Sequence, residues 1–213
     1  MDSISLFNNN LNEYENWFTK NILAYETELK AIKQIAPIPE KSIEIGVGSG
    51  LFAGPCGIKY GIDPAGNMLV KAQARGVETI RGKAEALPLA DNSFEYALMV
   101  TAICFVDDPL AALAEIYRIL VAKGVFVLGF VDKSSFLGKN YQKKKHKSLF
   151  YKDAKFFTLE EINVLLKKVG FEISEILQTL FDFPENLTEV QVPVKTKNKG
   201  GFTVIKAQSR FKK

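Results

Sequence analysis

Apolar residues recur along this chain with two alternating periods. Short runs rich in Ile, Val and Phe are typical of buried strands, and they occupy residues 42–45, 60–63, 77–80, 94–100 and 125–131. Apolar residues three and four apart predict helices at 65–75 and from Asp108-Pro109 to Leu120, ending near Gly124. Strands that alternate with helices in this way predict a parallel α/β sheet with helices on both faces.

The first forty residues precede this alternation. Apolar side chains keep the helical period over residues 11–34, and Pro37 ends the pattern. We therefore expect an accessory helix outside the sheet. Its aromatic residues Tyr14, Trp17 and Phe18 have two interpretations, a lid over a ligand or ordinary packing in the core.

The alternation breaks again after the fifth predicted strand. Residues 132–157 form a long insertion rich in lysine. A capping box that begins at Thr158 then predicts a helix, which Gly170 ends. Two β-rich segments follow, at 171–180 and 201–208.

The main candidate for chemistry is the stretch Glu44-Ile45-Gly46-Val47-Gly48-Ser49-Gly50. A strand that ends in a glycine turn presents backbone N–H groups to a ligand, and a side chain in the turn would keep that ligand away. The dinucleotide fingerprint is G-x-G-x-x-G, whereas here the third glycine comes one residue early. Glu44, at the end of its strand, could reach a cation such as the α-amine of an amino acid. S-adenosylmethionine carries such an amine, and nicotinamide dinucleotides do not.

A second acid, Asp63, ends the next predicted strand about 20 residues after Glu44. An acid at this position binds ribose hydroxyls in nucleotide-binding folds. The alternative is that Asp63 only caps the helix that begins at Pro64.

The chain has 213 residues, 47% of them hydrophobic, which is enough for one buried core. The net charge is +4, but basic residues gather in 139–155 and 191–213, so the rest of the chain is acidic. The lysine run has three interpretations: a solvated loop, a flap over an acidic or phosphorylated substrate, or a contact with RNA.

Composition also excludes some chemistry. His146 is the only histidine, which excludes a His-rich metal site and a Ser-His-Asp triad, and we expect no metal. Cys56 and Cys104 are too far apart for a metal or redox motif and should be reduced. No apolar run approaches the roughly 18 residues of a membrane span, and no leader pattern opens the chain. We therefore expect a cytoplasmic protein without membrane contact.

Together these residues resemble the class I S-adenosylmethionine-dependent methyltransferases of the type-11, small-molecule group. Five motifs stand in the family's order: Glu44 to Gly50, Gly61-Ile62-Asp63-Pro64, Ala84-Glu85-Ala86-Leu87-Pro88, Asp91-Asn92-Ser93-Phe94-Glu95, and the helix that follows Asp108-Pro109. The resemblance implies a Rossmann-like, seven-stranded, mostly parallel sheet whose last strand, 201–208, is antiparallel. It implies a single domain with a cap helix (1–40), a cofactor-binding half (41–131), the lysine-rich insertion (132–157) and a C-terminal part (158–213).

The resemblance also implies roles for individual residues around S-adenosylmethionine. The methionine moiety would face Glu44, Gly46, Gly48 and Gly50. The ribose would bind Asp63, the adenine would lie on Met68, and its exocyclic amine would bind the Ala84-Glu85 step. Thr101 and Ala102 would line the channel of the methyl group.

The implied reaction is methyl transfer by in-line displacement to an N, O, S or C nucleophile of a small molecule, with S-adenosylhomocysteine as the product. Such chemistry depends on positioning and needs no dedicated catalytic residue. Many relatives have a His pair where this chain has Cys104-Phe105. If the acceptor must lose a proton, the candidate bases are Tyr14, Asp107, Tyr141 and His146. For His146, a solvated loop position is the simpler account.

Two alternative functions stay open at this point. The first is an RNA or protein methyltransferase that uses the lysine-rich segment to bind its substrate. The second is a protein that binds S-adenosylmethionine without catalysis.

Overall fold

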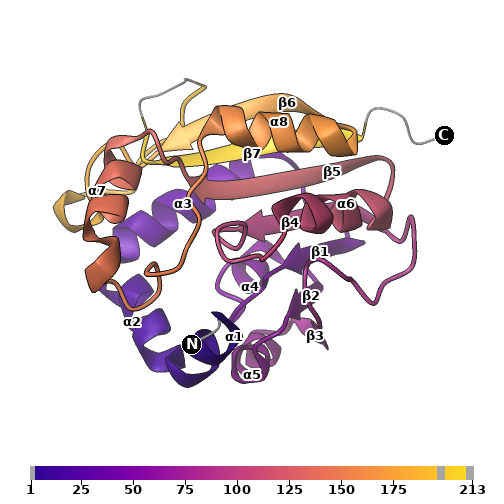
Figure 1. The fold of residues 1–213 in the computed structure, drawn as a ribbon, viewed down its shortest axis with the longest axis horizontal. Coiled ribbons are helices and arrows are strands. Elements are labelled where there is room, and N and C mark those ends of the chain that lie inside the picture. Colours follow the sequence, from indigo (N-terminus) through magenta and orange to yellow (C-terminus); the bar gives the residue numbers. More distant parts are fainter. Residues whose placement is uncertain (1–2, 196–199, 210–213) are drawn as a thin grey trace.

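The computed structural model describes residues 3–195 and 200–209 and shows a seven-stranded sheet with helices on both faces (Figure 1). The strand order is β3-β2-β1-β4-β5-β7-β6. The strands are β1 (Ser42–Ile45), β2 (Tyr60–Asp63), β3 (Glu78–Arg81), β4 (Phe94–Val100), β5 (Leu120–Val131), β6 (Phe171–Thr179) and β7 (Phe202–Ser209). β7 runs antiparallel to β5 and β6, and the pairs among β1 to β5 are parallel. The predicted fold, with its antiparallel last strand, is confirmed.

The start of β5 corrects one expected boundary. The helix α6 (Pro109–Ile119) ends five residues earlier than Gly124, and β5 follows it directly. Leu120 is fully buried and pairs with Phe94 of β4. Because of this pairing, Leu120 belongs to strand β5 and not to the helix. The smaller error at β3, which begins at Glu78 instead of 77, is within the usual uncertainty of element ends.

Helices cover the two faces of the sheet in separate layers. α6 and α8 (Leu159–Val169) bury their apolar sides on one face, and Figure 1 shows both in front of the sheet. α4 (Ala53–Cys56) and α5 (Gly66–Ala74) cover the other face together with the last of the N-terminal helices. The predicted capping box is confirmed, because the Thr158 side chain accepts the Glu161 N–H and the Glu161 carboxylate accepts the Thr158 N–H.

The expected single helix over residues 11–34 is wrong. The N-terminal region forms three helices, α1 (Ser3–Asn9), α2 (Leu11–Lys20) and α3 (Ile22–Ile35). Asn10 and Asn21 separate them, and each donates its side-chain amide to the carbonyl four residues earlier, at 2.8 Å. These bonds satisfy carbonyls at the helix ends and favour termination over continuation.

The break at Asn21 changes which face of α3 is buried. Ile22, an apolar position of the continuous pattern, is 46% exposed. The buried stripe instead includes Ala24, Ala31 and Ile35, and Glu28 lies in the same stripe with only 5% of its surface exposed. A carboxylate therefore faces the interior of the protein.

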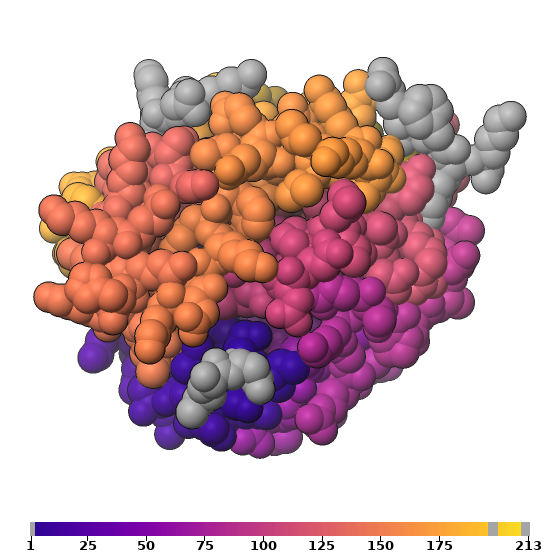
Figure 2. Space-filling view, in the orientation of Figure 1, coloured from indigo at the N-terminus to yellow at the C-terminus, as the bar shows by residue number. Residues whose placement is uncertain are grey.

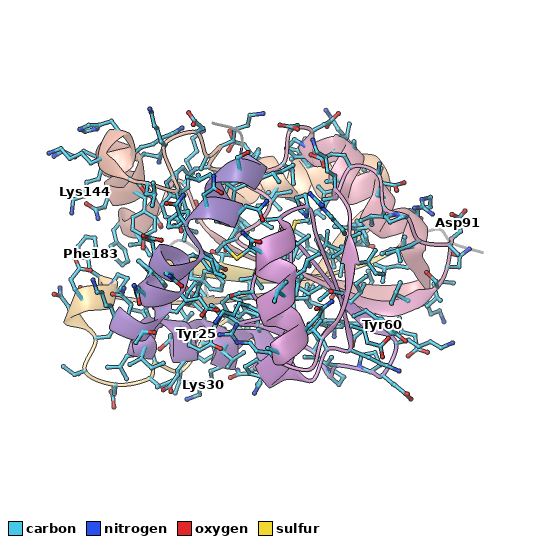
Figure 3. The ribbon with its side chains drawn as sticks, turned by 90° about the horizontal axis from the view of Figure 1, so that it is seen from below. Tyr25, Lys30, Tyr60, Asp91, Lys144 and Phe183 are labelled. Atoms are coloured by element: carbon cyan, nitrogen blue, oxygen red, sulfur yellow. The ribbon has the colours of Figure 1, made fainter. Side chains whose placement is uncertain are left out.

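The lysine-rich insertion has secondary structure of its own. It contains α7 (Phe136–Lys144) and a 3₁₀ helix, η1 (Lys145–Lys147), and another 3₁₀ helix, η2 (Pro184–Asn186), follows β6. Lys144 lies at the outer end of α7, at the periphery of the molecule (Figure 3). None of the helices in the described part of the chain is long and apolar enough to cross a membrane.

The sheet order places a topological switch point between β1 and β4. The chain leaves β1 toward β2 on one side, while β4 pairs with β1 on the other side. Ligands of open α/β sheets bind outside the carboxyl ends of the strands at such a point. In Figure 1, α1, α2 and α7 gather at this edge of the sheet.

Candidate functional site

A cavity opens at the carboxyl edge of the sheet beside the switch point. The turns after β1, β2 and β4 form its floor, and residues of α1, α2, α3 and the insertion complete its wall. Figure 2 shows the indigo N-terminal residues lying against the orange residues around position 150 on this side of the molecule. The rings of Phe7 and Phe150, which stack with centroids 5.2 Å apart, join the two segments.

The glycine turn after β1 is shaped by close backbone approaches. Gly46 lines the cavity at φ +73°, and a Cβ atom there would lie 2.5 Å from the Cβ of Ala102. Gly50 does not line the cavity, but at φ +81° its backbone lies against α5, where a Cβ atom would be 3.0 Å from the Ala72 backbone. Larger residues would separate the turn from β4 at the first position and from α5 at the second.

Asp63 fixes the middle of this turn. Its Oδ2 accepts the Gly48 N–H at 2.9 Å and its Oδ1 accepts the Ala65 N–H at 2.8 Å. Asp63 does not cap α5, because this helix begins at Gly66 and its N-cap residue, Ala65, has no side-chain cap. The bond to Gly48 was not indicated by the sequence. Asp63 and Gly48 both line the cavity, and each carboxylate oxygen keeps acceptor capacity for a further donor.

Glu44 lies behind the turn and outside the cavity lining. It is 1% exposed, and the Ala53 N–H donates to its carboxylate. Its Oε2 has no hydrogen-bond partner within the described ranges. Burial raises the pKa of Glu44, and the nearby charge of Asp63 raises it further. The expected contact of Glu44 with an amine stays a prediction.

The predicted adenine end of the site forms one wall of the cavity. Met68 of α5 is buried there, beside Ala84 and Glu85. Glu85 Oε1 accepts the Asp107 N–H at 2.7 Å, which ties this loop to the segment after β4. Asp107 itself lies at the mouth, where its carboxylate forms an ion pair with Lys83 at 3.5 Å.

Thr101 and Ala102 line the cavity at the end of β4, where the sequence placed them. Thr101 has φ +52°, a conformation that a β-branched residue rarely adopts. Its N–H donates to the Gly129 carbonyl, and its own carbonyl accepts the Cys104 thiol at 2.9 Å. Backbone strain of this kind is common at functional sites. Cys104, like Cys56, is a free thiol as expected.

Aromatic rings form the outer wall. Phe7 packs against Phe105 with ring centroids 5.0 Å apart and against Tyr14 at 5.8 Å. Tyr151 stacks on Phe105 at 6.0 Å. Trp17, whose role the sequence left open, also lines the cavity. Its aromatic residues thus include Phe7, Tyr14, Trp17, Phe18, Phe105, Tyr141, Phe150 and Tyr151.

The candidate bases lie in different settings. Burial raises the pKa of Tyr14 and of Tyr141, which keeps both phenols neutral at physiological pH. Both line the cavity, as does Asp107 at its mouth. His146 is exposed in η1 and lies outside the lining.

Sequence reasoning missed Glu28, a carboxylate in the cavity wall. Burial raises its pKa to about 8. The signal was present as an acid within the stripe of Ala24, Ala31 and Ile35, but the assumption of a continuous helix concealed that stripe. Phe7 and Phe150 were missed because contacts so distant along the chain leave no local pattern.

Comparisons with known proteins identify the family. Residues 43–128 match the family described as "Methyltransferase domain". A solved structure from Thermotoga maritima, described as a SAM-dependent methyltransferase and possible histamine N-methyltransferase, is 47% identical, covers 97% of this chain and 99% of its own, and has a TM-score of 0.94. The chain belongs to the S-adenosylmethionine-dependent methyltransferases. It is an enzyme of this family, and S-adenosylmethionine is its cofactor.

Two curated relatives extend the comparison. An uncharacterized protein of Methanocaldococcus jannaschii is 37% identical over 205 residues, which cover 96% of this methyltransferase and 99% of the relative. A demethylmenaquinone methyltransferase of Geobacillus stearothermophilus is 30% identical over 138 residues, which cover 62% of this chain and 56% of that protein.

The site of this methyltransferase fits S-adenosylmethionine on three observations. The turn at Gly46 and Gly48 brings half-buried backbone to the cavity surface. Asp63 presents oxygen acceptors in the cavity wall, suited to ribose hydroxyls. The unpartnered Oε2 of Glu44, directly behind the turn, matches a cofactor that carries an amine.

The raised pKa of Glu28 predicts a pH-dependent stability. In the folded enzyme this carboxyl keeps its proton up to about pH 8, whereas its ordinary pKa is 4.5. The folded state therefore binds the extra proton in this window, and the free energy of unfolding should fall as pH rises from about 4.5 to 8. We expect Glu28→Gln to remove this loss and to be more stable than wild type by a few kcal/mol at pH 8, at about 1.4 kcal/mol per pKa unit.

Urea unfolding at pH 5, 6.5 and 8 measures this difference. Glu26→Gln, which removes an exposed carboxylate two residues away, is the control and should follow the wild-type curve. Parallel pH curves for wild type and Glu28→Gln would contradict the assignment.

Proposed function

We propose that this methyltransferase transfers its methyl group to a small molecule bound in the aromatic cavity. The observation that carries the proposal is the wall contributed by α1, α2 and the insertion, which surrounds the space beside Thr101 and Ala102 with aromatic rings. Enclosed, mostly apolar cavities with a few polar groups are typical of small-molecule sites. The T. maritima protein is described as a possible histamine N-methyltransferase and the G. stearothermophilus protein as a demethylmenaquinone methyltransferase, and both descriptions name a small molecule, which agrees with this proposal.

We further propose how the cofactor is held. Gly46 and Gly48 would receive the methionine moiety, with Glu44 behind them as the partner of its amine. Asp63 would accept the ribose hydroxyls, and Met68 with the Ala84-Glu85 step would enclose the adenine. When bound, S-adenosylmethionine would supply an electrophilic methyl group on sulfur.

The residues of the cavity would contribute orientation and exclusion of water. Fixing two reactants in a productive geometry is worth about 7 to 11 kcal/mol of a barrier. Tyr14 lies above the turn, where a Cβ atom on Gly48 would be 3.4 Å from its hydroxyl oxygen. Its neutral phenol is suited to donate a hydrogen bond to a ligand in this position.

The lysine content of residues 132–157 suggests an acidic or nucleic-acid substrate. The positions of these lysines in the structure favour such a substrate less. Lys145 donates to the Ala154 carbonyl at 2.7 Å and Lys155 to the Asp107 carbonyl at 3.1 Å, so both stabilise the insertion. The segment contributes the aromatic residues Tyr141, Phe150 and Tyr151 to the cavity lining, whereas its lysines are absent from it. Binding of an acidic acceptor or of RNA stays a prediction of the sequence.

Replacing Asp63 with Ala should weaken cofactor binding more than tenfold. The change removes the predicted ribose acceptor and frees the Gly48 N–H, so the turn loses its fixed shape. Calorimetric titration with S-adenosylhomocysteine measures the effect, with NAD as the control ligand and Asp91→Ala, remote from the cavity, as the control variant. Wild-type affinity in Asp63→Ala would contradict the ribose assignment, and binding of NAD alone would contradict the cofactor.

RNA binding can be tested on the exposed lysines. We expect wild type and the triple variant Lys143→Gln, Lys144→Gln and Lys147→Gln to leave the mobility of poly(U) unchanged at low salt and to bind S-adenosylhomocysteine equally. These lysines are exposed and lie outside the cavity lining. Binding that weakens steeply with salt and is lost in the triple variant would instead favour the RNA methyltransferase.

A further inference from the structure

We propose that Glu28 is the centre of an acceptor subsite that binds a protonated amine. This inference rests on the proposed function, because it assigns a substrate class to the same aromatic cavity. It makes amines the acceptors, with Glu28 as the group that recognises the ammonium.

The first support is the unpaired state of the carboxylate. Glu28 lies in the cavity wall with 95% of its surface buried. Across residues 3–195 and 200–209, its side chain forms neither a hydrogen bond nor an ion pair. Glu15, another carboxylate of the N-terminal helices, has Arg75 as its partner at 2.7 Å. A buried carboxylate without a partner is costly, and a cationic ligand would relieve that cost.

The second support is the set of phenols around Glu28. Its charge contributes to the raised pKa of Tyr14, Tyr141 and Tyr151, which come from α2, α7 and the loop after η1. Three segments thus bring phenol side chains into the same cavity that Glu28 lines. No described residue hydrogen-bonds to any of these three hydroxyls, so they remain free to bind a ligand beside Glu28.

The third support is the chemistry of the remaining wall. Ring faces attract cations, and the effect is largest where the site excludes water. Glu28, Asp63, Glu85 and Asp107 supply four carboxylates to the lining, against a single ammonium from Lys83 among the described residues.

Glu28 is also suited to take the proton that an amine must release. Methylation needs the nitrogen lone pair, so one proton leaves the ammonium before the new N–C bond forms. Free Glu28, with a pKa of about 8, keeps its proton near neutral pH, so binding of the ammonium first displaces that proton to solvent and leaves the carboxylate ionised beside the nitrogen. One ammonium proton then moves to a Glu28 carboxylate oxygen, the freed nitrogen lone pair forms the new N–C bond, and the methylated product carries the positive charge that the sulfonium loses.

The test compares matched probes on the enzyme saturated with S-adenosylhomocysteine. 2-Phenylethylamine and n-hexylamine are the amines, 2-phenylethanol is the neutral analogue, and phenylacetate is the anion. We expect at least one amine to bind ten times more tightly than 2-phenylethanol in wild type. Glu28→Gln should lose this preference through weaker amine binding, and Glu26→Gln should keep it.

The controls separate this inference from the proposed function. All three proteins should bind S-adenosylhomocysteine within twofold of one another, which also shows that Glu28→Gln is folded. The inference is overturned if no amine binds, if the alcohol or the acid binds as tightly as the amines, or if Glu28→Gln keeps the preference. If S-adenosylhomocysteine fails to bind, the cofactor proposal fails, and the same titrations without it still decide the role of Glu28.

Discussion

The close approach of two backbone turns at the carboxyl edge of the sheet is the constraint on which this site depends. The turn after β1 passes so near the end of β4 that a single added carbon at Gly46 would collide with Ala102. The hydrogen bond from Gly48 to Asp63 then connects this turn to the end of β2. These contacts hold the ends of β1, β2 and β4 in a fixed arrangement. The turns at these three ends form the floor of the cavity.

Much of the fold was predictable because short segments of the sequence determine it. The strand runs, the proline and aspartate that start α6, and the capping box at Thr158 act within a few residues of each other. The N-terminal helices were not predictable to the same degree. Asn10 and Asn21 are compatible with a helix interior, and only their side-chain bonds to Leu6 and Trp17 show that they end helices.

The floor and the wall of the cavity also differ in how well the sequence predicts them. Gly46, Gly48, Asp63 and Met68 belong to short motifs at or just after strand ends, and they line the cavity, while their contacts with the cofactor stay a prediction. Glu28, Phe7 and Phe150 come from three separate segments, and only tertiary packing brings them to one cavity. The sheet therefore provides a floor that sequence motifs reveal, while the wall that would select the acceptor depends on insertions.

The position of α1 has a practical consequence for handling the protein. Ser3, Ile4 and Phe7 line the cavity, and the Asn67 N–H of α5 donates to the Asn8 side chain at 2.9 Å, so α1 lies beside the candidate site. β7 runs antiparallel to β5, and Gln208 pairs with Val125, which places the end of β7 at the opposite edge of the sheet (Figure 1). An affinity tag fused before Ser3 would begin beside the cavity and could block the entry of a ligand. A tag fused after β7 would leave that entrance open.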